Sequence, residues 1–453
     1  MPGIDEQKMQ RCDTLILAGW CIPVEPDDIV LSDYAVAIDD GKIIDLLPAP
    51  DARRRYEASV LVQRPDHILL PGFVNAHTHA AMSLLRGIAD DMPLERWLRD
   101  IIWPVENRCV SAEMVRDGTR LAIAEMLKSG CTCFSDQYFF PEIVAETADD
   151  MDMRAMVGTP VIEFPTAWAD GAAECLSKGT DLVHDPYADH ALVSTCFVPH
   201  STATVSDESF RALRVLADQL DRRIQIHLHE SKQEIDDEFK KSGKRPLERL
   251  AELGLVNASL MAVHAVHTTE DEVRLLADAG VSVAHCPRSN LKLADGIAPI
   301  AAYKQADINV ALGTDSAASN NVMDMLGEMR TASLLAKAQA DDATAVPAAQ
   351  ALRMATLDGA ESLGLADSIG SIKPGKWADL ACIDLNHLNS QPVYDPVSQL
   401  VYTVYPHQVS DVWVAGKHQL DNGTLTRIDV DELLQRTSEW QFRIANEQHR
   451  KLA

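Results

Sequence analysis

The amino-acid sequence predicts an α/β protein in which a (β/α)8 TIM barrel carries a small β-sandwich domain built from both termini. Between residues 71 and 365, eight strand-like segments alternate with helix-like ones, which is typical of a barrel of parallel strands. On both sides of this region the sequence is β-like. We therefore predict four segments: the N-terminal half of the β-sandwich (1–70), the barrel (71–368), the C-terminal half of the β-sandwich (369–428) and a C-terminal helix (429–453).

The two terminal regions have the short alternating segments of a β domain. The expected strands are Thr14–Ala18, Ala35–Asp39, Lys42–Leu47, Ala378–Asp384 and Val409–Gly416. Asp39-Asp40-Gly41 is typical of a hairpin turn, and Lys373-Pro-Gly-Lys376 marks another turn. Because neither half is large enough to bury a core alone, we expect them to share one sheet domain.

The middle region supplies the strands and helices of the barrel. The expected strands are Ile68–His79, Cys131–Asp136, Arg154–Val161, Ala191–Pro199, Arg223–Glu230, Leu260–Val266, Val281–His285 and Asn309–Asp315. Between them lie helical patterns such as Ser111–Ser129, which ends before Gly130, and Asp207–Leu220. The first strand is not followed by a glycine-rich phosphate loop, which argues against a dinucleotide-binding domain.

Composition narrows the class of protein further. The net charge of −27, from 41 basic and 68 acidic side chains, predicts that neither nucleic acid nor an anionic membrane is a partner. The nine cysteines are scattered and form no paired CxxC spacing that would indicate a zinc knuckle or redox motif. No signal-peptide core and no membrane-spanning run is found, so we expect a soluble, cytoplasmic protein.

Two histidines end the first barrel strand. Residues two apart on a strand project to the same side, so His77 and His79 can offer two nitrogen ligands to one metal ion. Alone, His-x-His is also compatible with two ordinary polar residues at the end of a strand.

Other strand ends decide between these interpretations, because chemistry in a barrel sits at the carboxyl ends of its strands. Further histidines or an aspartate end the fourth to eighth strands: His200, His227, His229, His264, His285 and Asp315. Each has an ordinary structural explanation by itself, but together they predict a metal site. Strand alternation points His227 and His229 to the same side, so spacing does not choose between them.

Several motifs together resemble the amidohydrolase superfamily. They are Pro71-Gly-Phe-Val-Asn-Ala-His77-Thr-His79, His227-Leu-His-Glu230, His285-Cys-Pro-Arg-Ser-Asn290 and Gly313-Thr-Asp315. Trp103-Pro-Val-Glu106, Pro199-His200-Ser-Thr and Thr314-Asp315-Ser-Ala-Ala-Ser-Asn-Asn321 make the chain most similar to the 5′-methylthioadenosine/S-adenosylhomocysteine deaminases of the triazine-hydrolase branch. The likeness covers nearly the whole chain.

The resemblance implies that one divalent ion, usually zinc, is bound by His77, His79, His227 and Asp315. Such nitrogen–oxygen donor sets also accept iron or manganese. Binuclear relatives carry a carboxylated lysine on the fourth strand, and Ala191–Pro199 contains no lysine, which favours one metal. The family pattern His-x-x-Glu selects His227 as the ligand and leaves His229 beside the site.

The resemblance also implies the roles of the remaining site residues. A water activated by the metal attacks C6 of an adenine, Asp315 and His264 accept and orient its proton, and Glu230 protonates N1. Glu106 is expected to read the ribose hydroxyls, and His200 to contact the nucleoside near its glycosidic bond. Trp97 and Trp103 are candidates for an apolar wall beside the 5′-thioether.

Three arginines are candidates for meeting the carboxylate of S-adenosylhomocysteine: Arg154, Arg86 and Arg288. Arg154 is our prediction for the substrate-binding residue, although no motif fixes the role of any of the three. Arg288 could instead support the loop after His285, and Arg86 could be an ordinary surface residue.

The predicted function is zinc-dependent hydrolytic deamination of adenine nucleosides, namely 5′-methylthioadenosine, S-adenosylhomocysteine and adenosine. The alternatives are a guanine or other nucleobase deaminase, a triazine chloro- or aminohydrolase of the same branch, and a non-catalytic barrel scaffold. Glu230 favours a deaminase, and the Trp-Pro-x-Glu segment favours a ribosylated substrate. A homo-oligomer is the expected assembly.

Overall fold

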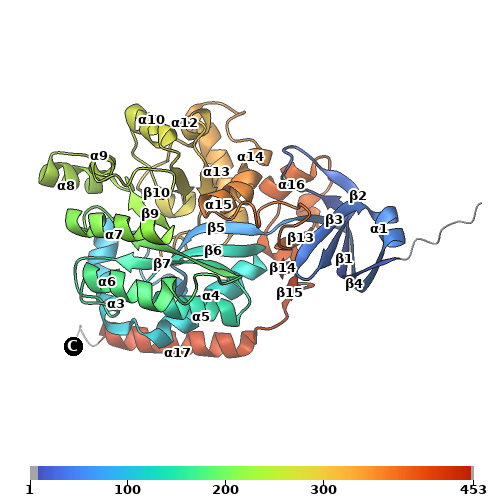
Figure 1. Ribbon diagram of the computed structural model, residues 1–453, viewed down its shortest axis with the longest axis horizontal. Helices are drawn as coiled ribbons and strands as arrows, with labels where there is room; N and C mark the ends of the chain where they lie inside the picture. Colours follow the sequence, from blue (N-terminus) through green and yellow to red (C-terminus); the bar gives the residue numbers. More distant parts are fainter. Residues whose placement is uncertain (1–8, 450–453) are drawn as a thin grey trace, which may run out of the picture.

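The computed structural model describes residues 9–449, which form two eight-stranded sheets, one of them surrounded by helices (Figure 1). One sheet is a barrel of parallel strands, and the other is a mixed sheet made from both ends of the chain. The predicted TIM barrel with a small β domain from both termini is therefore confirmed. Residues 1–8 and 450–453 of the predicted ranges lie outside the described residues.

The barrel strands follow one another in space in the order of the sequence. They are β5 (Phe73–Thr78), β6 (Cys131–Gln137), β7 (Arg154–Val161), β8 (Val193–Pro199), β9 (Arg223–Leu228), β10 (Leu260–His264), β11 (Ser282–His285) and β12 (Val310–Leu312). The last strand meets the first where the Asp315 N–H donates to the His77 carbonyl at 3.0 Å. The eight barrel strands overlap the predicted segments: β7 has the predicted bounds, β6 ends one residue later, and the others are shorter. Residues 68–71 of the predicted first strand belong to β4 (Tyr56–Pro71) of the second sheet.

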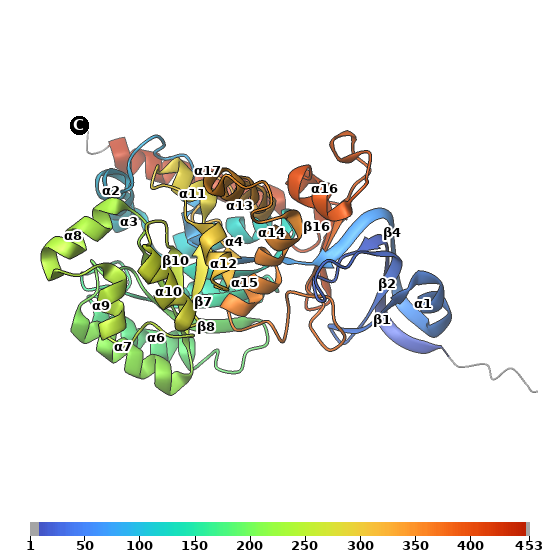
Figure 2. The ribbon, with the colours of Figure 1, turned by 90° about the horizontal axis from the view of Figure 1, so that it is seen from above.

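Helices connect these strands and cover the outside of the barrel (Figure 2). They are α4 (Ala112–Lys128), α5 (Pro141–Asp150), α6 (Ala172–Gly179), α7 (Asp207–Leu220), α8 (Lys232–Ser242), α9 (Pro246–Glu252), α10 (Glu270–Asp278), α11 (Pro287–Lys292), α12 (Ile300–Gln305), α13 (Met325–Ala340), α14 (Ala348–Met354) and α15 (Leu357–Ser362). Local sequence sets their ends. The Ser111 side chain caps α4 by accepting from the Met114 N–H, and Gly130 follows that helix with φ of 85°.

The connection between β5 and β6 is long and carries an additional helical segment. This additional segment precedes α4 and consists of η1 (Ala80–Leu85), α2 (Leu94–Trp97), η2 (Leu98–Ile102) and α3 (Trp103–Cys109). The C-terminal helix α17 (Val430–His449) packs along α4 (Figure 1), where the Trp440 indole and Arg436 both donate to the buried carboxylate of Asp117. None of the helices in residues 9–449 is long and apolar enough to cross a membrane.

The second sheet joins the two ends of the chain. Its strands are β1 (Gln10–Cys21), β2 (Leu31–Asp39), β3 (Lys42–Pro48), β4 (Tyr56–Pro71), β13 (Leu380–Asp384), β14 (Val409–Val414), β15 (Lys417–Asp421) and β16 (Thr424–Leu425), with helices α1 (Ala49–Arg55) and α16 (Pro396–Tyr402) beside it. β4 pairs with β1 in parallel and with β13 in antiparallel register, so it is the strand that unites the two halves.

The same β4 strand leads into the barrel through Gly72. The Gly72 N–H donates to the Asp379 carbonyl at 2.9 Å, and a Cβ at this position would lie 2.1 Å from the Thr132 side chain. Only glycine leaves room for this close approach. The Pro71-Gly72 step is therefore the point at which the small domain is fixed to the barrel.

A buried ion pair holds the two domains together at the same end of the barrel. Arg154, the first residue of β7, donates to Asp379 at 2.7 and 3.1 Å, and the two side chains are 4% and 1% exposed. This corrects our prediction that Arg154 binds substrate. It lies at the amino end of its strand, whereas the other predicted site residues lie at carboxyl ends.

Replacing Arg154 with alanine should lower the free energy of unfolding by about 3–5 kcal/mol, because it leaves the Asp379 carboxylate buried without its partner. Unfolding in denaturant measures the loss. Lys240→Ala is the matched control, since its pair with Asp237 is exposed and should contribute less than about 1 kcal/mol. Equal losses in the two variants would contradict a structural role for Arg154.

Candidate active site

The two histidines at the end of the first barrel strand are held in place by hydrogen bonds of the residues next to them. His77 is the last inward-facing residue of β5, and His79 follows the strand directly. The Asp136 carboxylate accepts from the Ala80 N–H at 2.6 Å and from the Thr78 hydroxyl at 3.0 Å. This buried side chain therefore fixes the backbone on which both histidines stand.

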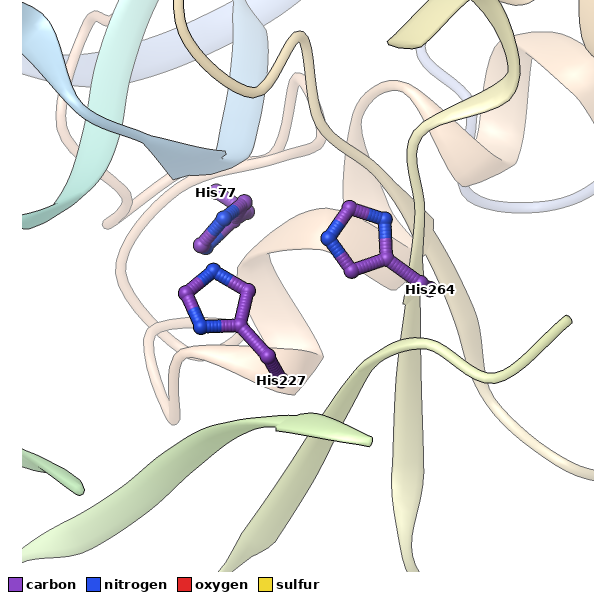
Figure 3. A group of neighbouring side chains, drawn as sticks. All are labelled: His77, His227 and His264. Carbon is purple, nitrogen blue, oxygen red and sulfur yellow. The ribbon is translucent and has the colours of Figure 1, made fainter. Parts of the chain in front are cut away.

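Four imidazoles converge at the carboxyl ends of three strands, and Figure 3 shows three of them, His77, His227 and His264, facing one another. The ring centroid of His77 lies 4.9 Å from that of His79, 5.0 Å from His227 and 5.8 Å from His264. His77, His227 and His264 offer nitrogen atoms that lie within 4.8 Å of one another. The predicted histidines of the first, fifth and sixth strands therefore meet.

Backbone carbonyls orient two of these rings. Nδ1 of His79 lies 2.5 Å from the Gln137 carbonyl oxygen, and Nδ1 of His227 lies 2.8 Å from that of His200. A carbonyl only accepts, so each Nδ1 carries the hydrogen. Nε2 is then the atom of each ring that can bind a metal ion.

Side-chain amides stand behind the other two rings. Gln225 lies 2.8 Å from Nδ1 of His77, and Asn290 lies 3.0 Å from Nδ1 of His264. An amide can present either its oxygen or its nitrogen. Oxygen toward the ring would satisfy Asn290 Oδ1, which has no hydrogen-bond partner among residues 9–449, and would leave Nε2 of His264 available as a ligand.

Asp315 completes the cluster with a carboxylate. One oxygen accepts from the Ser289 and Ser319 hydroxyls at 2.6 and 2.8 Å. The other lies 3.6 Å from Nε2 of His77 and 3.3 Å from Nε2 of His79. Burial alone would raise the pKa of Asp315, but the two imidazoles hold it well below its usual range. The carboxylate is therefore ionised.

These residues fit one divalent metal ion. Nε2 of His77 and of His264 are buried and have no hydrogen-bond partner within the described chain. Buried polar atoms are normally paired, so unpaired imidazole nitrogens directed at one point indicate a ligand. His77, His79 and Asp315 form one compact group of donor atoms, and His77, His227 and His264 form another. The geometry therefore adds His264 to the candidate ligands.

Glu230 lies beside this cluster. Its carboxyl oxygen is 3.4 Å from Nε2 of His264, and its own N–H donates to Glu234 at 2.8 Å. Burial, followed by the negative charges of Asp295 and Asp315, raises the pKa of Glu230 well above its usual range. Its carboxyl group therefore holds a proton more readily than an exposed glutamate does.

A largely apolar cavity of about 720 Å³ opens from the cluster. Glu106, on α3, lies in its wall and accepts a hydrogen bond from the Tyr138 hydroxyl at 2.8 Å. Burial raises the pKa of Glu106 to about 7, although the hydrogen bond acts in the opposite direction. His200 also lines the cavity, and burial lowers its pKa to about 4, so the ring is neutral.

The two tryptophans singled out in the sequence, Trp97 and Trp103, both line the cavity. Trp103 meets Phe164 edge to face, with ring centroids 6.4 Å apart. The part of the cavity away from the histidines is thus walled by aromatic rings from the β5–β6 connection and from the loop after β7.

Other histidines and arginines of the sequence lie outside this arrangement. His229 is turned away from the cluster, with φ of 53°, and its Nε2 lies 3.3 Å from the Leu247 N–H. Arg86 pairs with Glu125, and Arg288 lies near Asp324 and Glu328. The structure thus brings together the histidines, Asp315, Glu230, Glu106 and His200, and leaves the three arginines apart.

Sequence reasoning missed the residues that orient the site, namely Gln225, Asn290, Tyr138, Ser289 and Ser319. Gln225 was open to prediction, because it lies two residues before His227 on the same face of β9. The others follow strand ends or lie on helices, where period-two alternation no longer indicates direction.

A parallel barrel with this donor cluster at the carboxyl ends of its strands defines a hydrolytic enzyme of the amidohydrolase class. The sequence profile of the amidohydrolase family matches residues 68–418, and the chain belongs to this family.

Its relatives make the class more specific. The chain is 46% identical, over 94% of its length and 96% of the relative, to a 5-methylthioadenosine/S-adenosylhomocysteine deaminase of Teredinibacter turnerae. An adenosine deaminase of Xanthomonas campestris with bound zinc is 50% identical, with a TM-score of 0.96 over 97% of this chain and 100% of that one. The atrazine chlorohydrolase of Arthrobacter aurescens, complexed with zinc, is 25% identical, with a TM-score of 0.88 over 94% and 99% of the two chains. The protein is a hydrolytic deaminase.

Protein purified without chelators should contain about one equivalent of a divalent metal, as a single four-ligand site implies. Replacing His227 with asparagine should remove most of it, because that ring faces the cluster. His229→Asn is the matched control, two residues away and turned from the site, and should keep its metal. Elemental analysis by mass spectrometry measures both. Metal loss from the His229 variant instead would reverse the assignment of the two histidines.

Proposed function

We propose that this enzyme removes the 6-amino group of adenine nucleosides by hydrolysis, acting on 5′-methylthioadenosine and its 5′-thio relatives, with zinc as the resident metal. The observation that carries the proposal is the position of Glu230, a buried carboxyl group beside the histidine cluster at the inner end of a cavity large enough for a nucleoside. The names of the relatives and the zinc in related structures support it.

A divalent metal ion would be held by His77, His79, His227 and Asp315, with His264 beside them. When bound it would lower the pKa of a water toward neutrality. Deamination adds water at C6 of the purine while N1 gains a proton, and the amino group then leaves as ammonia. The ionised Asp315 and the neutral His264 receive and orient the proton of the attacking water. Both lie within reach of one point in front of Glu230.

Glu230 supplies the proton for N1. A carboxyl group does so only if it is protonated when the substrate arrives, which the burial and neighbouring negative charges of Glu230 favour. Protonation at N1 removes the negative charge that would otherwise build up on the ring as C6 becomes tetrahedral. The proton that Asp315 and His264 took from the water then passes to the departing amine, and the Glu230 carboxylate accepts the proton of the new C6 hydroxyl, which returns each group to its starting state.

Glu106 is placed to hold the ribose. Its carboxylate can accept hydrogen bonds from the 2′- and 3′-hydroxyls, while Tyr138 fixes its orientation. His200 lines the same cavity, with its ring 5.2 Å from that of His227, and in this proposal contacts the nucleoside near its glycosidic bond. The cytoplasmic location and the homo-oligomer stay predictions.

Replacing Glu230 with glutamine should lower kcat by about 10²–10⁴-fold, the usual contribution of a general acid. The amide keeps the shape of the side chain but has no acidic proton to give. Metal content should stay that of the parent protein. The exposed Glu208→Gln is the control and should retain full activity. A Glu230→Gln variant that turns over normally would remove the basis for this mechanism.

The substrate class is tested by comparing 5′-methylthioadenosine, S-adenosylhomocysteine and adenosine, following the absorbance change from adenine to hypoxanthine. Turnover of at least one of the three is expected. If all are inert while a free nucleobase or a triazine is hydrolysed, the enzyme belongs to one of those substrate classes.

Replacing Glu106 with glutamine should lower kcat/KM for adenosine by about tenfold to hundredfold, because hydrogen bonds from two hydroxyls to a charged acceptor are weakened. The sugar of 2′,3′-dideoxyadenosine lacks both hydroxyls, so its kcat/KM should hardly change. An equal loss for both nucleosides would assign Glu106 to a task other than binding the ribose.

A further inference from the structure

The cavity carries carboxylic acids and, apart from the histidines of the site, no basic side chain. Of its lining residues within the described chain, none is a lysine or an arginine. Six are carboxylic acids: Glu95, Glu106, Glu230, Glu234, Asp237 and Asp315. Glu230 and Asp315 serve the chemistry and Glu106 faces the sugar, which leaves Glu95, Glu234 and Asp237 in the remaining wall.

The arginines considered for a substrate carboxylate are all engaged elsewhere. Arg154 is paired with Asp379 at the opposite end of the barrel, and Arg86 is paired with Glu125. Arg288 lies between Asp324 and Glu328, which hold it outside the cavity wall. The lysines of α8 are exposed, and Lys240 pairs with Asp237 at 3.0 Å.

The orientation of the nucleoside follows from the proposed function, on which this inference rests. With C6 at the histidine cluster and the ribose at Glu106, the 5′ substituent extends along the aromatic wall formed by Trp103 and Phe164. Glu95, Gln233 and Asp237 also line the cavity and are exposed to solvent, and Glu95 accepts a hydrogen bond from Ser231, the residue after Glu230, at 2.9 Å. We call these three residues the acidic rim.

The cavity wall is expected to bind apolar and charged 5′ substituents with different affinities. A thioether methyl group would bury its apolar surface against Trp103 and Phe164. The amino-acid tail of S-adenosylhomocysteine would instead bring a carboxylate toward the acidic rim, where the negative charge of Glu95 would repel it and where Lys240 is already paired with Asp237. The ammonium group of the same tail could pair with Glu95 or Asp237, so the carboxylate alone is disfavoured.

We propose that the 5′ end of this cavity selects against a carboxylate, so that the enzyme prefers nucleosides whose 5′-thio substituent is neutral or carries only an amine. The selection comes from the absence of a basic partner in the wall together with the acidic rim.

Three nucleosides distinguish an effect of the carboxylate charge from an effect of the size of the 5′ substituent. They are 5′-methylthioadenosine, S-adenosylhomocysteine and 5′-deoxy-5′-(3-aminopropylthio)adenosine. The last keeps the chain and amine of S-adenosylhomocysteine but lacks its carboxylate. We expect kcat/KM for S-adenosylhomocysteine to be about tenfold to hundredfold below that for 5′-methylthioadenosine. Removing the carboxylate should restore most of the difference. Raising the salt concentration should narrow it, because the rim is open to solvent.

Two results would overturn the proposal. Equal kcat/KM for S-adenosylhomocysteine and 5′-methylthioadenosine would mean that the carboxylate is tolerated. An amine-only nucleoside as poor as S-adenosylhomocysteine would mean that the wall selects by size. If none of the three is turned over, the proposed function fails and not merely its selectivity.

A substitution in the protein tests the same proposal. Gln233→Arg adds a cation to the rim and should raise kcat/KM for S-adenosylhomocysteine relative to 5′-methylthioadenosine by about fivefold or more. Gln233→Met, of similar size and without charge, should leave the ratio unchanged. Turnover of 5′-methylthioadenosine shows that each variant is folded. An unchanged ratio in an active arginine variant, or the same rise in both variants, would contradict the proposal.

Discussion

The closure of the barrel between its last and first strands is the contact on which the site depends. The Asp315 N–H donates to the His77 carbonyl at 3.0 Å, so one hydrogen bond joins two candidate ligands that are far apart in the chain. Asp315 has φ of 59°, a conformation that aspartate tolerates better than most residues. The turn brings its carboxylate back over the barrel mouth, where the Ser289 and Ser319 hydroxyls hold one oxygen and the other faces the imidazoles.

The same closure brings two carboxyl groups, those of Asp315 and Glu230, into one pocket that is largely buried from solvent. Asp315 stays ionised because His77 and His79 adjoin it, whereas burial and its neighbours raise the pKa of Glu230. Two carboxyl groups in one pocket therefore occupy different protonation states, as hydrolysis of an amidine requires of its base and its acid. A divalent cation at the histidines would strengthen this division, because it favours the charged form of the nearer carboxylate.

The fold and the centre of the site could be predicted from the sequence because both follow from periodic patterns. Strand alternation and the rule that barrel chemistry lies at carboxyl ends predicted that His77, His264, Asp315 and one of His227 and His229 meet, and the resemblance to the amidohydrolase superfamily selected His227. The same rule argues against Arg154 as a substrate ligand, since this residue begins its strand and does not end it. We assigned Arg154 to the substrate because a substrate carboxylate would need a cation. In the structure Arg154 pairs with Asp379 instead.

What the sequence did not provide is the direction of side chains after a strand has ended. His229 has the spacing of a ligand, yet the chain leaves β9 at Leu228 and adopts φ of 53° at His229, which turns the ring toward Leu247. Asn290 and Tyr138 act on His264 and Glu106 across contacts between separate elements. Such contacts depend on how helices pack on the barrel, and local patterns carry no information about that packing.

The chemical groups and the groups that contact the rest of the substrate lie on different parts of the fold. The donors and Glu230 stand at strand ends, where neighbouring strands fix the backbone on both sides. Glu106, Trp97 and Trp103 stand on the α2–α3 segment between β5 and β6, and Phe164 on the loop after β7. Loops and short helices tolerate substitution and insertion far better than barrel strands do. Substrate preference can therefore change through these segments while the hydrolytic centre stays intact. If the proposed function holds, we expect the charge of the cavity wall, and not the histidine cluster, to decide selectivity among nucleosides.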